Sequence, residues 1–170
     1  MASNFFEKDL EDIIMENLDK IESRGFPKLY KNTERQVYLP NNGGKIDILS
    51  WEIVDNVFYG KIIELKKDSL SLSALIQAAD YHLQILLSLI GNFDNSNVEV
   101  ILIGSDYDDD LDNIVLLSNF LTTYRYHYNW DGIYFKKGTS RDEFVDSFYK
   151  MKPFSVYSEF IEKLRNPKNE

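Results

Sequence analysis

Apolar residues recur along the chain with two different periods, and these periods predict its secondary structure. Residues 4–23 and 71–90 carry apolar side chains at helical spacing, so each stretch is predicted to form an amphipathic helix. Gly91 follows the second stretch as a C-terminal cap. In the first helix the apolar positions are Phe6, Leu10, Ile13, Ile14, Leu18 and Ile21.

Strands are predicted between these helices and beyond them. Residues 45–53 and 57–65 are rich in β-branched side chains and flank the turn Asp55-Asn56, which indicates a hairpin. The continuous apolar run at residues 98–103 is typical of a strand that is buried on both faces. Further strands are predicted at residues 36–39, 123–130 and 132–136.

Two more helical segments complete the predicted order, one at residues 110–120 and one at residues 141–164 with an interruption near Pro153. Helices and groups of strands then alternate, which predicts an α/β fold of three layers with a central mixed β-sheet flanked by helices. No repeat or Pro/Gly-rich linker divides the chain, and its 170 residues are about one domain in length. We therefore expect a single domain over residues 1–170.

Composition excludes several classes of site and of location. The chain has no cysteine, so it has no disulfide, no zinc-thiolate centre and no catalytic thiol. The N-terminus lacks the basic and apolar regions of a signal peptide. The longest apolar run, near residues 85–90, is too short to span a bilayer. We expect a soluble, cytoplasmic protein that does not bind membranes.

Charged residues interrupt the second strand of the predicted hairpin at its end. Glu64 and Lys66 are two residues apart, so they are expected to point to the same face while Ile63 and Leu65 point into the core. Such a pair is often an exposed ion pair that contributes little to stability. Its position at the end of a hairpin of apolar strands also suits a functional site on a rigid scaffold.

Asp47, on the preceding strand, is predicted to join this pair. We expect its side chain to face opposite to Ile46 and Ile48, and the hairpin to bring it beside Glu64. Two carboxylates at close range repel each other unless a cation lies between them. Mg²⁺ prefers oxygen ligands and keeps several waters, and Asp47, Glu64 and the backbone carbonyl of Leu65 could supply part of its coordination shell. Mn²⁺ is the expected substitute.

Lys66 would then act beside the ion. Its ammonium group could orient the attacking water or help to deprotonate it, and could neutralise charge that develops on phosphorus. Water and a substrate phosphate would complete the coordination of the metal.

These residues resemble the signature of the PD-(D/E)XK nucleases, in which an aspartate is followed on the next strand by Glu-x-Lys, here Asp47 and Glu64-x-Lys66. The first predicted helix resembles the first helix of that family, which carries a glutamate facing the site. The residues Gln77 and Tyr81 resemble the Gln-x-x-x-Tyr motif of the RecB-like and NucS-type branches. The amino-acid sequences of the two strands are most similar to those of the NucS-type nuclease domain.

The resemblance covers about half of the chain, with a motif core at residues 5–90 followed by strands and helices at residues 98–165. It implies a restriction-endonuclease-like fold and an Mg²⁺-dependent endo- or exonuclease that hydrolyses phosphodiester bonds, most simply in DNA, in repair, restriction or a mobile element. Two alternatives stay open: a nuclease-fold module that binds nucleic acid or protein without catalysis, and a nuclease that acts on RNA.

Two departures from the family pattern stand out. Ile46 occupies the position before the aspartate where the signature has proline, a substitution that is common in this loosely defined signature. The separate DNA-binding domain of the NucS-type enzymes has no room in this chain, so substrate recognition is left open.

The resemblance also assigns roles to residues around the centre. Glu7 and Glu11 are four residues apart and compete for the helix glutamate, and Glu7 matches the family position better. Gln77 could hold the lysine or a metal-bound water, and Tyr81 could contact a phosphate. The alternative for this pair is packing of the helix on the sheet. Lys45 and Lys67 are expected to bind phosphates at the rim of the site.

The formal net charge of −9 argues against a protein that coats nucleic acid, since such proteins are usually basic. A local basic rim can still hold phosphates. We therefore expect modest intrinsic affinity for DNA, or delivery of the substrate by a partner protein or within a homodimer. Alternating aromatics at Tyr124, Tyr126, Tyr128 and Trp130 could stack on bases, although such a stripe more often belongs to the core.

Overall fold

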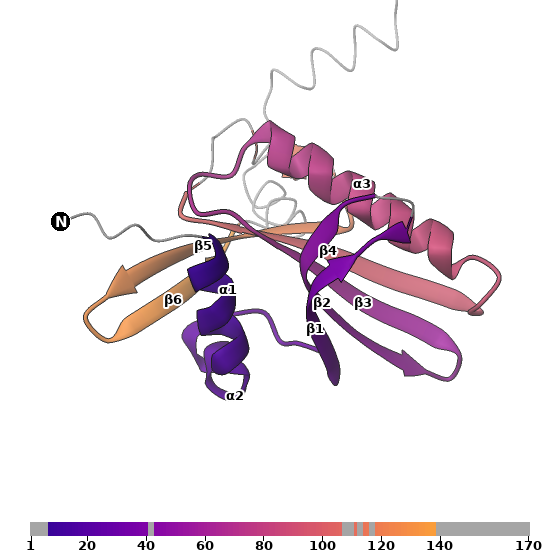
Figure 1. Cartoon of the computed structure of the whole chain (residues 1–170), viewed down its shortest axis with the longest axis horizontal. Helices are drawn as coiled ribbons and strands as arrows, with labels where there is room; N and C mark the ends of the chain where they lie inside the picture. The colour runs from indigo at the N-terminus through magenta and orange to yellow at the C-terminus, as the bar shows by residue number, and fades with distance from the viewer. Residues whose placement is uncertain (1–6, 41–42, 107–110, 112–113, 116–117, 139–170) are drawn as a thin grey trace, which may run out of the picture.

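The architecture is a six-stranded mixed β-sheet with helices on both faces (Figure 1). A computed structural model describes residues 7–40, 43–106, 111, 114–115 and 118–138. The strands are β1 (Asn32–Tyr38), β2 (Lys45–Val54), β3 (Val57–Leu65), β4 (Asn95–Gly104), β5 (Leu121–Asn129) and β6 (Gly132–Lys137). The α/β class and the mixed sheet predicted from the sequence are confirmed.

Strands lie in the sheet in the order in which they follow one another along the chain. The antiparallel pairs are β1 with β2, β2 with β3, and β5 with β6. The parallel pairs are β3 with β4 and β4 with β5, and α3 (Leu72–Leu89) forms the crossover between β3 and β4. The predicted hairpin turn is confirmed at Asp55 and Asn56, which both adopt the positive φ that tight hairpin turns need.

Helices cover the two faces of the sheet. The N-terminal helical region consists of α1 (Glu7–Glu16), α2 (Leu18–Ile21) and the 3₁₀ turn η1 (Glu22–Arg24). The sequence predicted one continuous helix here, but it breaks at Asn17, whose side-chain amide donates to the carbonyl of Ile13 at 2.8 Å. Gly25, with φ of 87°, ends the region.

Each face of the sheet has its own hydrophobic core. On one face, α3 places Leu75, Ala78 and Tyr81 against residues such as Ile62 and Leu102. On the other face, α1 packs against a second cluster that contains Leu10, Ile14, Ile63, Leu65, Ile101 and Ile103. Strand β4 therefore contributes to both cores, as its continuous apolar run predicted. Figure 1 shows α3 and the pair α1 and α2 on opposite sides of the sheet.

Other predicted elements differ in length or lie outside the described residues. The long helix at residues 71–90 is confirmed as α3, with Ser71 accepting from the amide of Ala74 as an N-terminal cap. β1 begins at Asn32, four residues earlier than predicted. In the predicted helix at residues 110–120, residues 111 and 114–115 are helical, and residues 118–120 are not. The predicted helical segment at residues 141–164 lies outside the described residues.

Within the described ranges, no helix combines the length and the apolar character that crossing a membrane requires.

Candidate active site

Asp47 occupies the point at which β2 stops pairing with β3. The paired register between these strands includes Ile48 and Ile63 but does not continue to Asp47. Instead the carboxylate Oδ2 of Asp47 accepts a hydrogen bond from the backbone amide of Leu65 at 2.8 Å. The side chain thus occupies a position in the ladder that a backbone carbonyl would otherwise fill.

This arrangement changes the side-chain alternation of β2. Ile46 belongs to the core beneath α3, whereas Ile48 belongs to the core beneath α1. In a regular strand, residues two apart lie on one face. The expectation that Asp47 faces opposite to both isoleucines is therefore wrong, because the strand turns over at Asp47 while its carboxylate caps β3.

A matching irregularity lies across from Asp47 in β1. The register between β1 and β2 pairs Arg35 with Ile48 and Val37 with Ile46, and leaves Gln36 between them. Gln36 has φ of 56°, in the left-handed region that residues with a Cβ rarely adopt. The ladder is therefore interrupted at Gln36 and Asp47, which face each other, without an extra residue in either strand.

Glu64 is a buried carboxylate at the end of β3, with 1% of its surface exposed. Its Oε2 lies 3.5 Å from Nζ of Lys66, as expected if the two side chains share a face. Its Oε1 is buried without a hydrogen-bond partner in the described structure. Burial raises the pKa of Glu64 to about 8, the Asp47 carboxylate adds to the rise, and Lys66 opposes it.

Asp47 shares this electrostatic environment. Burial raises the pKa of Asp47, and the nearby Glu7 carboxylate adds to the rise. The hydrogen bond from the Leu65 amide and the charge of Lys66 act in the opposite direction. Asp47 thus raises the pKa of Glu64, and Glu7 raises that of Asp47, so a cation placed among these carboxylates would relieve their repulsion.

The donor set fits Mg²⁺ only with help from backbone and water. Among the described residues, no group of three or more Asp, Glu, His or Cys side chains is arranged to hold a metal ion. Asp47 and Glu64 supply two carboxylates, and the Leu65 carbonyl lies at the same end of β3. Magnesium is commonly bound by one or two carboxylates while it keeps several waters, so this small set suits it.

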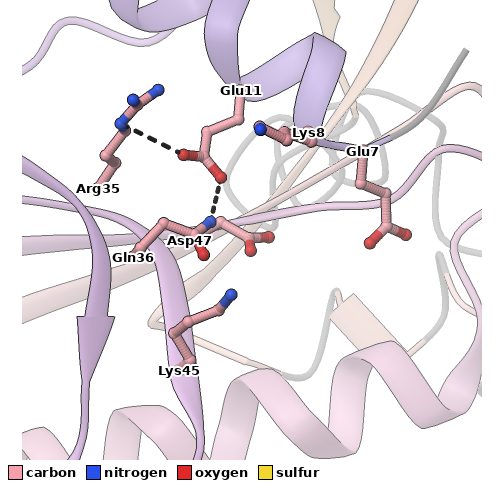
Figure 2. Close-up of a pocket in the computed structure, with 7 residues that line it drawn as sticks. All are labelled: Glu7, Lys8, Glu11, Arg35, Gln36, Lys45 and Asp47. Carbon is pink, nitrogen blue, oxygen red and sulfur yellow. Dashed lines mark hydrogen bonds and ion pairs between the residues drawn. The ribbon is translucent and has the colours of Figure 1, made fainter.

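A pocket of about 470 Å³ opens beside Asp47. It lies between α1, β1 and the start of β2, and Figure 2 shows its side chains converging from these elements. Its described lining consists of Glu7, Lys8, Glu11, Arg35, Gln36, Lys45 and Asp47. Three carboxylates and three cations thus line one cavity, which suits a charged ligand such as a phosphodiester with a cation.

The two competing glutamates of α1 have different surroundings. Glu11 is 4% exposed, accepts a hydrogen bond from the side chain of Gln36, and lies 3.8 Å from Nε of Arg35 (Figure 2). Glu7 is exposed and accepts from the backbone amide of Lys67 at 3.3 Å. The contacts of Glu11 thus join α1 to β1, whereas Glu7 contacts the backbone that directly follows Lys66. This favours Glu7 for the helix glutamate, and its catalytic role stays a prediction.

Gln77 and Tyr81 support the start of β2 from α3. Tyr81 is buried, and its hydroxyl accepts from Nε2 of Gln77 at 2.7 Å and from the amide of Lys45 at 3.4 Å. Gly44, with φ of 107°, has no space for a side chain because a Cβ would lie 2.7 Å from the Tyr81 ring. These contacts are those of helix packing on the sheet. Contact of Tyr81 with a phosphate, and of Gln77 with the lysine or a water, stay predictions.

The two rim lysines occupy different places. Lys45 lines the pocket beside Asp47. Lys67 is exposed, and its backbone is held from both sides, with its amide donating to Glu7 and its carbonyl accepting from the Tyr126 hydroxyl. Lys8 and Gln36 also line the pocket but were not singled out from the sequence. Lys8 neighbours Glu7 in the chain, which was an available signal, whereas nothing local marks Gln36.

Comparisons with known proteins bear on the fold. No protein-family model matches the chain, and no curated protein matches it. Among solved structures, the chain is similar to a repair endonuclease from Pyrococcus abyssi, with a TM-score of 0.52 and 19% sequence identity. The similarity covers 74% of this chain and 48% of that protein, so the chain matches about half of its length. The chain therefore shares the fold of part of that endonuclease, and among the described residues this fold is a mixed six-stranded sheet flanked by helices.

Proposed function

We propose that this chain is a metal-dependent nuclease of the PD-(D/E)XK class that hydrolyses phosphodiester bonds in DNA. The observation that carries the proposal is Glu64, a buried carboxylate whose Oε1 has no described partner and which shares its surroundings with Asp47 and Lys66. Lys66 lies beside Oε2 only, and a buried carboxylate oxygen is rarely left without a partner, so the unpartnered Oε1 supports a cation site. The nuclease fold gives independent support.

In this proposal Asp47 and Glu64, with the carbonyl of Leu65, hold Mg²⁺ or Mn²⁺. When bound, the ion supplies Lewis-acid polarisation of the phosphate and lowers the pKa of a coordinated water. The hydrogen bond from Leu65 fixes Oδ2 of Asp47 and leaves its other oxygen to face the ligand. A fixed carboxylate needs no reorganisation when the substrate arrives.

The lysines and Glu7 have separate roles toward the water and the phosphate. The Lys66 ammonium group, held 3.5 Å from Oε2 of Glu64, orients the attacking water and offsets charge that builds up on the phosphate. Lys8 and Lys45 line the pocket and bind non-bridging oxygens of the substrate. Glu7 lies at the pocket mouth beside Lys67 and positions water. Lys8 and Lys45 thus place positive charge in the pocket beside Asp47, and Lys66 places it beside Glu64, which is not among the described residues that line this pocket.

A cleavage assay tests the proposal. The protein is incubated with single- and double-stranded DNA and RNA in Mg²⁺, Mn²⁺ or EDTA, beside Glu64→Gln and the matched control Glu34→Gln, which alters an exposed glutamate on β1. We expect DNA cleavage that needs the metal and Glu64 but not Glu34. Cleavage that persists in EDTA, or equal loss in both variants, would contradict the metal site, and cleavage of RNA alone would contradict the substrate.

A further inference from the structure

The hairpin of β5 and β6 extends beyond the rest of the sheet at the end where the candidate site lies. Pairing of β3 with β4 ends at Leu65 and Ile103, and pairing of β4 with β5 ends at Gly104 and Arg125. Strand β5 continues to Asn129, paired there with β6 alone. Figure 1 shows this hairpin projecting past the body of the sheet. We refer to residues 126–134 as the arm.

An aromatic side chain is held in the open at the tip of the arm. Trp130 is 97% exposed, the highest value among the large hydrophobic side chains of the described residues. The turn that carries it is fixed, because Nη1 of Arg24 donates to the carbonyl of Asp131 at 2.8 Å. A Cβ at Gly132 would lie 2.5 Å from the same guanidinium, so the anchor packs closely. The indole is thus presented to solvent on a rigid support.

The arm already contains stacked rings. His127 and Tyr134 pair across the two strands with ring centroids 5.7 Å apart and an angle of 19° between their planes. The Arg24 guanidinium lies 5.0 Å from the centroid of the Tyr134 ring on the same hairpin. Of the alternating aromatics noted in the sequence, Tyr124 and Tyr126 belong to the core, whereas Tyr128 is 45% exposed. The exposed half of that stripe therefore lies on the arm.

Charge on the hairpin differs in sign from the chain as a whole. Between residues 121 and 137 there are three cations and one carboxylate, Asp131, in a chain of net charge −9. Arg125 forms an ion pair with Asp106 at 3.3 Å, so the positive charge that the hairpin offers to a ligand comes from Lys136 and Lys137. Asp131 accepts from the Tyr134 hydroxyl. Lys136 and Lys137 are exposed at the base of the arm. Exposed aromatics combined with local positive charge are complementary to bases and phosphates.

The arm is connected to the candidate site by direct contacts. The Tyr126 hydroxyl donates to the carbonyl of Lys67, which directly follows Lys66. The amide of Lys67 donates to Glu7. From Tyr126 to Trp130 is four residues, or about 13 Å of extended chain, which corresponds to about four nucleotides of a strand stacked as in duplex DNA, at about 3.4 Å each. A nucleic-acid strand that crosses the candidate site therefore reaches the tip of the arm within a few nucleotides.

We propose that the arm is a nucleic-acid contact surface on which an unpaired base stacks against Trp130, while Lys136 and Lys137 at its base bind phosphates of the same nucleic-acid strand nearer the candidate site. The choice of nucleic acid as the ligand rests on the proposed function. The stacking itself is independent of the metal and of bond cleavage. It gives the chain a means of recognition outside the pocket around Asp47.

Fluorescence tests the arm directly, because Trp51 and Trp130 are the two tryptophans of the chain. In a Trp51→Phe/Glu64→Gln background, Trp130 is the sole indole and the substrate stays uncut. We titrate this protein with single-stranded DNA, with a blunt duplex, and with a duplex that carries a single-stranded flank. We expect quenching of Trp130 by both DNAs that contain unpaired bases, and little quenching by the blunt duplex.

Affinity gives a second readout. Base–aromatic stacking corresponds to a loss of about 5- to 100-fold in affinity for Trp130→Ala, and Trp130→Phe retains part of it. The matched control is Tyr38→Ala, which removes a 78% exposed aromatic on β1, far from the arm. Equal affinity of Trp130→Ala and the parent, or unchanged Trp130 emission on saturation, would overturn the arm. The proposal would also be overturned if Trp130→Ala lost self-association or a contact with another protein but kept its affinity for DNA.

The two proposals fail separately. If Trp130 stacks on DNA but the native chain cuts no nucleic acid, the arm stands and the nuclease proposal falls. If the wild type and Trp130→Ala both cut DNA and have the same KM, the nuclease proposal stands and the proposal for the arm is wrong.

Discussion

The carboxylate of Asp47 and the backbone amide of Leu65 are joined by a hydrogen bond of 2.8 Å that closes the end of the β2–β3 hairpin. This contact fixes Asp47 at the position where its charge raises the pKa of Glu64. One side chain therefore completes the sheet and sets the electrostatics of the candidate site. The predictions below follow from that coupling.

Glu64 makes the metal-free protein sensitive to pH. Its pKa of about 8 in the folded state lies above the ordinary value of 4.5, so the folded state binds the proton more tightly than the unfolded state. This contribution to stability is complete below about pH 4.5 and is lost as pH rises to about 8. Each pKa unit corresponds to about 1.4 kcal/mol, so we expect the free energy of unfolding to fall by up to a few kcal/mol.

Urea denaturation in EDTA at a series of pH values measures this loss. Glu64→Gln mimics the protonated side chain, so it should flatten the profile between pH 5 and 8 and be more stable than the wild type at pH 8. Glu34→Gln, at an exposed site, serves as the control and should keep the wild-type slope. A wild-type profile that rises over this interval would show that Glu64 is ionised in the folded protein.

Divalent metal should stabilise the fold through Asp47 and Glu64. An ion that binds the native state alone raises the melting temperature by mass action, with about 2.7 kcal/mol gained at a concentration 100-fold above Kd. Thermal melts with Mg²⁺ or Mn²⁺ should show this increase for the wild type and not for Asp47→Ala. An equal increase in both proteins would mean that the ion binds elsewhere.

Metal binding near neutral pH should also release a proton. Because the pKa of Glu64 is about 8, this group is largely protonated at pH 7 in the metal-free protein and must ionise to become a ligand. Calorimetric titration with Mn²⁺ in buffers of different ionisation enthalpy reports the number of protons released. We expect close to one per ion at pH 7 and fewer at pH 9, whereas a count that does not depend on pH would argue against Glu64 as a ligand.

Lys66→Ala should impair the chemical step and leave metal binding intact. One preorganised electrostatic group is typically worth about 10²–10³ in rate, and lysine is not a metal ligand. Cleavage rates measured beside a metal titration separate the two effects, with Lys31→Ala as an exposed control. Arginine at position 66 should restore little activity, because a planar guanidinium does not replace a compact ammonium. Near-normal cleavage by Lys66→Ala would defeat the proposed mechanism.

Tyr81→Phe distinguishes packing from contact with substrate. The variant keeps the buried ring but leaves the amide of Lys45 and the side chain of Gln77 without their shared acceptor. We expect about 1 kcal/mol less stability and a modest fall in kcat through displacement of the start of β2. If Tyr81 instead binds a phosphate, KM should rise while the melting temperature stays unchanged.

Sequence alone was sufficient for the parts of the site that depend on strand periodicity. Nζ of Lys66 lies 3.5 Å from Oε2 of Glu64, although Lys66 follows the last residue of β3, and the Asp47 carboxylate is near enough to raise the pKa of Glu64. The class of the fold followed from the alternation of helical and strand periods. These features are local in sequence, so local patterns report them.

Features that depend on contacts between distant segments could not be predicted. The reversal of faces between Ile46 and Ile48 arises because the Asp47 carboxylate reaches the end of another strand. The positive φ of Gln36 could not be predicted, because glycine or asparagine usually marks such a position and this residue is a glutamine. The preference for Glu7 over Glu11 rests on Gln36 and Arg35, which contact Glu11 from β1, and the role of Glu7 stays a prediction.

Because the six described strands lie in the sheet in chain order, the sheet can grow in the direction of synthesis. Strands β1 to β3 pair as a local meander within residues 32–65, and without β4 the strand β3 would be an edge of the sheet. In the complete sheet Leu102 of β4 pairs with Glu64 in the parallel register. The burial of this carboxylate thus goes together with that of β4, whose apolar side chains enter both cores and offset the cost of dehydrating Glu64.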